Sequence, residues 1–101
     1  MRLLVILSPT EKWGTKTEYT KLRKFLKKDG YLRIAPEVYM RIVQHRKAAE
    51  KHYRRIGDVA PKTGTVRMLR LTERQYSNMY LIAGEVNYKE KAVGCNSHIM
   101  I

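Results

Sequence analysis

The sequence has little of what secreted, membrane-spanning or disulfide-stabilised chains contain. Its single cysteine, Cys95, excludes an internal disulfide and agrees with a reducing compartment. Its longest early apolar run, residues 3–7, is too short for a membrane-spanning helix or for the core of a secretory signal. We therefore expect a cytoplasmic protein.

Acidic residues are also scarce. The chain has 9 Asp and Glu against 21 Lys and Arg, which gives a formal net charge of +12. Solubility does not require such an excess, so it favours a polyanionic partner, nucleic acid before an anionic membrane surface. Because phosphate contacts read no bases, we expect binding that is broad in sequence and steeply dependent on salt.

Motifs for metal, nucleotide and covalent chemistry are missing from the sequence. It has no GxGxxG and no GKS or GKT phosphate loop. Cys95 and His98 have a C-x-x-H spacing, but a zinc site needs about four ligands and no second pair accompanies them. His45 and His52 border or occupy a basic helical pattern, where a surface histidine or a phosphate neighbour is the usual outcome. We assign no catalytic residue and no metal ligand.

The sequence does contain alternating strand and helix patterns within one domain. Runs rich in β-branched and aromatic residues predict strands at residues 2–7, 31–34, 38–43 and 65–71. Apolar residues at helical spacing predict one helix that begins near Thr15 and another over residues 46–56, which Gly57 and Asp58 end. Pro36 predicts an irregular hairpin turn. The order β-α-β-β-α-β predicts an α+β, ferredoxin-like fold with an antiparallel sheet and helices on one face.

Local signals mark the ends of the helices. Thr15 with Glu18, and Thr72 with Gln75, have the spacing of a capping box. Gly30 is expected to end the first helix as a left-handed cap. An RNA-recognition motif of the same fold is disfavoured, because neither central strand has the aromatic pattern that stacks single-stranded bases.

We divide the chain into a domain over residues 1–84 and a C-terminal extension over residues 85–101. The extension is polar at first and ends in short apolar pieces. It is either a frayed terminus or a strand that adds to the sheet edge of a partner.

The candidate contacts to nucleic-acid phosphates lie in the first loop and on the helix that follows it. They are Lys12, Lys16, Arg23 and Lys24. Trp13 in the same loop either stacks on a nucleotide or covers the core.

Five segments resemble the CRISPR-associated protein 2 family, and the match runs in order from residue 1 to about 85. The segments are residues 1–6, 22–31, 38–41, 49–52 and 64–72. The resemblance implies a homodimer of ferredoxin-like subunits whose C-terminal strands extend across protomers. It also implies a place in the CRISPR adaptation integrase, where the dimer bridges two dimers of the integrase subunit and holds duplex prespacer DNA.

The chain departs from that family at the residues linked to nuclease activity. Family members usually read Phe-Asp-Leu-Pro after the first strand, and some are assigned metal-dependent cleavage at that aspartate. This sequence has Leu7-Ser8-Pro9 there, with Ser8 nearest the aspartate, and it has Ala35 and Glu37 where glutamine and serine are typical.

These observations predict a non-catalytic DNA-binding scaffold for spacer acquisition that needs no cofactor of its own and no membrane. Its expected partners are a second copy, the integrase subunit and duplex prespacer DNA, with the effector nuclease or further adaptation factors as additional candidates. The alternative is a metal-dependent endoribonuclease or endodeoxyribonuclease that uses magnesium with Glu11 or Glu37. A third hypothesis is a small antiphage or toxin-like RNA-binding protein.

Overall fold

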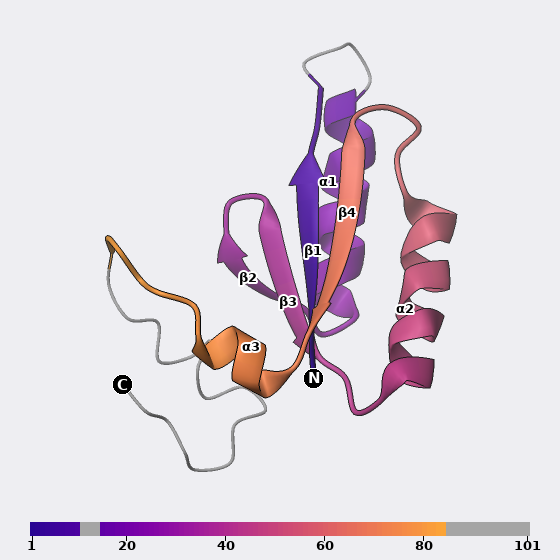
Figure 1. Cartoon of the computed structure of the whole chain (residues 1–101). Helices are drawn as coiled ribbons and strands as arrows, with labels where there is room; N and C mark the ends of the chain where they lie inside the picture. Colours follow the sequence, from indigo (N-terminus) through magenta and orange to yellow (C-terminus); the bar gives the residue numbers. More distant parts are fainter. Residues whose placement is uncertain (11–14, 85–101) are drawn as a thin grey trace.

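The structure, a computed structural model, describes residues 1–10 and 15–84. Its elements are β1 (Arg2–Ser8), α1 (Thr15–Lys28), β2 (Leu32–Ala35), β3 (Val38–Ile42), α2 (Arg46–Val59), β4 (Thr65–Leu71) and α3 (Glu73–Ser77). This order confirms the predicted ferredoxin-like α+β fold and adds a short helix after it (Figure 1). The extension predicted over residues 85–101 lies outside the described residues. No helix of the described ranges is long and apolar enough to cross a membrane.

The four strands form one antiparallel sheet in the order β2-β3-β1-β4. β1 lies in the interior of the sheet, hydrogen-bonded to β3 on one side and to β4 on the other. The hairpin between β2 and β3 is irregular, as predicted, because its register shifts between Arg33 and Ala35, just before Pro36. β2 and β4 are therefore the two edges of the sheet.

Both helices cover the same face of the sheet. Alternate strand residues point to opposite faces, and Leu3, Val5 and Leu7 of β1 point to the helices with at most 3% of their surface exposed. Around them the core contains Tyr19, Leu22, Leu26, Tyr31, Tyr39, Val43, Ala49 and Ile56. Burial of this apolar surface is what holds the helices against the sheet.

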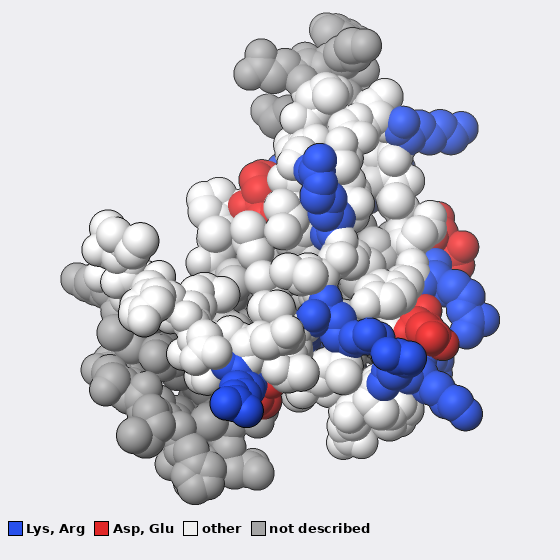
Figure 2. Space-filling model, viewed as in Figure 1, with Lys and Arg blue, Asp and Glu red and all other residues white. Residues whose placement is uncertain are grey.

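The other face of the sheet, here called the open face, is also largely apolar. Leu4 of β1 on this face is only 7% exposed, whereas Leu69 of β4 is 50% exposed. The exposed Arg67, which pairs with Ile6, lies on the same face. In Figure 2, where α1 lies behind the strands, few charged side chains occupy the middle of this face. After α3 the chain continues with four exposed apolar residues, 79–82.

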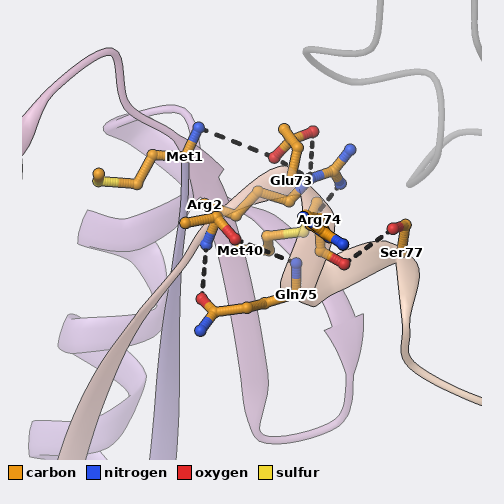
Figure 3. A network of polar contacts seen from close by, with 8 residues as sticks. Met1, Arg2, Met40, Glu73, Arg74, Gln75 and Ser77 are labelled. Carbon is orange, nitrogen blue, oxygen red and sulfur yellow. Dashed lines mark hydrogen bonds and ion pairs between the residues drawn. The ribbon is translucent and has the colours of Figure 1, made fainter.

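The short helix α3 is anchored at the edge of the open face. Its predicted capping box is confirmed: the Thr72 backbone N–H donates to Gln75 Oε1 at 2.9 Å, and the Gln75 backbone N–H donates to Thr72 Oγ1 at 3.0 Å. Arg2 Nε donates to both carboxylate oxygens of Glu73, which ties this helix to β1 (Figure 3).

The first helix ends as the sequence predicts. Gly30 has φ +93°, and the Tyr31 N–H donates to the Leu26 carbonyl at 2.9 Å, which is the pattern of a left-handed glycine cap. At its other end α1 begins at Thr15, but Glu18 Oε2 accepts a hydrogen bond from the backbone N–H of Lys62 at 3.3 Å. Glu18 therefore connects the start of α1 to the loop before β4.

The end predicted for the second helix is wrong. α2 continues through Gly57 and Asp58 to Val59, and Ala60 takes an extended conformation with ψ 141°. Pro61 explains this end, because a proline disfavours helical geometry in the residue before it. A glycine inside a helix costs only about 1 kcal/mol, which the packing of α2 on the sheet offsets.

Candidate nucleic-acid interface

The outward side of α1 carries a row of lysines. Lys21, Lys24 and Lys28 recur at i, i+3 and i+7, and all three are exposed. We call them the α1 stripe. At 1.5 Å of rise per residue, the stripe spans about 10 Å along the helix. It can contact backbone phosphates without reading bases.

The four predicted contact residues have different positions. Lys24 belongs to the α1 stripe and is exposed. Lys16 lies in α1, but its side chain is outside what the structure describes, and so is the whole of Lys12. Arg23 is on the side of α1 that adjoins β3, where one terminal nitrogen donates to Glu37 Oε1 at 2.7 Å. Of the two predicted contacts whose side chains the structure describes, Lys24 is exposed and Arg23 is paired with Glu37.

A second basic row lies on α2. Lys47, Lys51 and Arg54 follow i, i+4, i+7 spacing and are exposed; we call them the α2 stripe. Glu50 and Asp58 are exposed on the same helix and reduce its charge. Figure 2 shows Lys and Arg side chains gathered over α2 and the neighbouring end of β4. Sequence reasoning did not assign these residues as contacts, although their helical spacing was the available signal.

His52 is buried, so its interpretation as a surface histidine or phosphate neighbour is wrong. Its Nδ1 lies 3.2 Å from the Tyr31 hydroxyl and 3.4 Å from Asp29 Oδ2, and Arg55 donates to Asp29 Oδ1 at 2.6 Å. Burial, followed by the charge of Arg41, lowers the pKa of His52. Burial and Asp29 raise the pKa of the Tyr31 hydroxyl to about 12. The cluster joins the end of α1 to α2 and is not a nucleic-acid contact.

His45 has a structural position at the start of α2. It is the N-cap residue, in extended conformation, and its Nδ1 accepts a hydrogen bond from the backbone N–H of Ala48 at 3.2 Å. This satisfies one of the free N–H groups of the first turn.

Among the residues that the structure describes, the end of β1 does not offer the ligands that a divalent cation prefers. Ser8, an exposed neutral hydroxyl, stands there. Glu37 lies beside the strand end, because its carbonyl accepts from the Leu7 N–H at 2.8 Å, but its carboxylate is paired with Arg23. No group of three or more His, Cys, Asp or Glu within the described ranges could hold a metal ion. Glu11, the other candidate of the nuclease alternative, lies outside the described residues.

Known proteins are similar to this sequence over most of its length. The family model described as CRISPR associated protein Cas2 matches residues 12–79. A CRISPR-associated endoribonuclease Cas2 of Acidovorax ebreus is 39% identical over 94 residues, which cover 92% of each chain. One of Ligilactobacillus salivarius is 38% identical and covers 84% of this chain and 85% of the relative. Both the family match and these identities cover well over half of the sequence, and the chain therefore belongs to the CRISPR-associated protein Cas2 family.

Proposed function

We propose that the protein is a non-catalytic scaffold subunit of the CRISPR spacer-acquisition integrase complex, which holds duplex prespacer DNA through its phosphates. The observation that carries this proposal is the net charge of +12 together with exposed cations in rows on both helices. Lysine needs only charge and reach to bind a phosphate. The α1 stripe is the primary contact and the α2 stripe is the secondary one, and Lys12 and Lys16 remain further predicted contacts.

The scaffold acts as a homodimer that bridges dimers of the integrase subunit, which performs strand transfer. The open face supports the dimer, because no helix among the described residues covers most of it and exposed apolar residues commonly mark an interface. Such an interface would bury Leu69 and the exposed apolar residues 79–82. β4 is a sheet edge, to which an extended segment of a partner can add. The effector nuclease and further adaptation factors are additional candidate partners.

A metal-dependent endoribonuclease or endodeoxyribonuclease is the second candidate, because the relatives are named endoribonucleases. Such an enzyme would use magnesium to activate water and to stabilise charge on the phosphate. Ser8 and the paired Glu37 do not fit that ligand set. The scaffold is therefore the better supported function.

A titration of labelled duplex DNA at rising salt tests the proposal. The logarithm of the binding constant should fall linearly with the logarithm of the salt concentration, and Lys24→Gln should reduce that slope by about 1 for every duplex sequence. Salt-insensitive binding would reject the scaffold. Magnesium-dependent cleavage that Glu11→Gln or Glu37→Gln abolishes would establish the nuclease instead. Copurification with the integrase subunit, and the mass of the free protein in solution, test the partners.

A further inference from the structure

Arg23, a predicted DNA contact, is already engaged with an acidic side chain of the protein. Its terminal nitrogen donates to Glu37 Oε1 at 2.7 Å, which is the length of a charge-assisted hydrogen bond. The side chains of Arg23 and Glu37 are 26% and 35% exposed. The pair therefore lies at the surface, where a phosphate can approach the same guanidinium.

Glu37 is held in place by the sheet. Its backbone carbonyl accepts from the Leu7 N–H at 2.8 Å, and β3 begins with the next residue, Val38. Its second carboxylate oxygen is buried and has no hydrogen-bond partner among the residues that the structure describes. Arg23 therefore supplies the positive charge that stabilises this carboxylate, since a desolvated charge without a partner is unfavourable.

An anion beside Arg23 is favourable because other cations lie close to Arg23 on α1. Lys24 follows it directly and Lys27 lies one turn further along α1, and both are exposed. Like charges at i, i+4 spacing repel one another on a helix. A carboxylate relieves that repulsion, and so does a phosphate, for which the guanidinium fork is well suited.

We propose that Glu37 is a built-in competitor of DNA phosphate for Arg23. This inference rests on the proposed DNA-binding function. Arg23 contacts a duplex only when it leaves Glu37, and the Glu37 charge repels a phosphate that approaches while the pair is closed. The pair is an autoinhibitory contact, which lowers the affinity for DNA without removing a cation from the surface.

The test compares two variants that change the net charge equally. Glu37→Gln removes the competing charge and keeps the side-chain shape. Glu50→Gln is the matched control: Glu50 is exposed beside the α2 stripe and belongs to none of the ion pairs of the described residues, so this variant measures the general effect of one added net charge without the release of an arginine. Glu37→Ser, which also removes the carboxylate, is a second variant of the same kind. Each full-length variant is titrated with a labelled duplex, and circular dichroism reports whether it is folded.

Release of Arg23 should add one phosphate contact. We expect Glu37→Gln to bind about fivefold more tightly at low salt and to steepen the salt slope by about 0.9. That advantage should shrink by roughly threefold between about 50 and 200 mM salt, whereas Glu50→Gln should change affinity by less than about twofold. Arg23→Gln should cost more affinity in the Glu37→Gln background than in the native protein, because the arginine is free only there.

Equal effects of Glu37→Gln and Glu50→Gln would overturn the inference. So would an Arg23→Gln effect that is the same in both backgrounds. A native protein that does not bind duplex DNA would reject the proposed function itself. Native binding that is unaffected by Glu37→Gln and by Glu37→Ser would reject the competitor role alone.

Discussion

Arg2 and Glu73 stand 71 positions apart in the sequence and form an ion pair in which Nε lies 2.9 Å from Oε2. The Arg2 side chain is 2% exposed. Its guanidinium carbon lies 3.8 Å from the centroid of the Tyr76 ring. Its Nη1 lies 3.3 Å from Met40 Sδ (Figure 3). The pair therefore fastens α3 to the edge of the open face.

Replacement of Glu73 should destabilise the protein. Glu73→Ala leaves the buried Arg2 without its carboxylate, and we expect a loss of about 1–3 kcal/mol, moderated because Glu73 itself is 45% exposed. Urea unfolding measures it. Glu50→Ala on α2 is the control and should stay within about 0.5 kcal/mol. Equal losses in the two variants would show that the pair with Arg2 is not stabilising.

The free energy of unfolding should decrease as the pH is lowered, because of His52. Burial and Arg41, with a smaller effect of Arg55, hold the folded-state pKa of His52 below its ordinary value of 6.5, although Asp29 acts in the opposite direction. Below pH 6.5 the unfolded chain therefore binds a proton that the folded protein resists. The contribution of His52 to the free energy of unfolding is therefore present above pH 6.5, and it is lost as the pH falls below 6.5.

Urea unfolding between about pH 5 and pH 8 checks this dependence, since that window avoids most carboxylate titration. His52→Gln, which has no titrating group, should show a flatter profile. A profile as steep as that of the native protein would assign the pH dependence to another group.

The hydroxyl of Tyr39 should contribute nothing to stability. Tyr39 is fully buried, and its hydroxyl has no hydrogen-bond partner among the described residues. Tyr39→Phe should leave the free energy of unfolding unchanged or raise it by up to about 2 kcal/mol. Tyr31→Phe is the comparison, because the Tyr31 hydroxyl contacts His52 and its loss should cost about 1 kcal/mol. A larger loss at Tyr39 than at Tyr31 would contradict this assignment.

Two glycines should respond oppositely to alanine. A Cβ at Gly57 inside α2 meets nothing within 4 Å, so Gly57→Ala should stabilise the protein by about 0.5–1 kcal/mol. At Gly64 φ is +73°, and a Cβ would lie 2.7 Å from the Ser8 carbonyl oxygen and in contact with the Tyr19 hydroxyl. Gly64→Ala should lower the melting temperature, whereas Gly57→Ala should raise it. A rise for both would mean that the loop before β4 adapts freely.

The helix caps predicted correctly from the sequence are formed by residues only a few positions apart. The Thr72 capping box and the Gly30 cap are where the spacing placed them, because their hydrogen bonds join near neighbours. The end predicted for α2 at Gly57 was wrong, because that signal is weak compared with the packing of the helix. A glycine lowers helix propensity only weakly, and the burial of Ile56 against the sheet outweighs it.

The candidate interface was predicted only in part. Helical spacing identified Lys24 as outward-facing, but it gave the same status to Arg23, whose partner was not visible in a one-dimensional pattern. The helical spacing was also compatible with an exposed position for His52. Its burial depends on which side of α2 meets Tyr31 and Asp29.

The sequence by itself determined the fold class, the order of the strands and helices, and the strongly cationic surface, since hydrophobic period, caps and net charge are properties of local segments and composition. Only the tertiary structure decided which charges are free. Arg2 meets Glu73, and Arg23 meets Glu37, after β1 has taken its place between β3 and β4 and α1 has packed on the sheet. Ion pairs between distant segments depend on that packing, and no spacing along the chain specifies them.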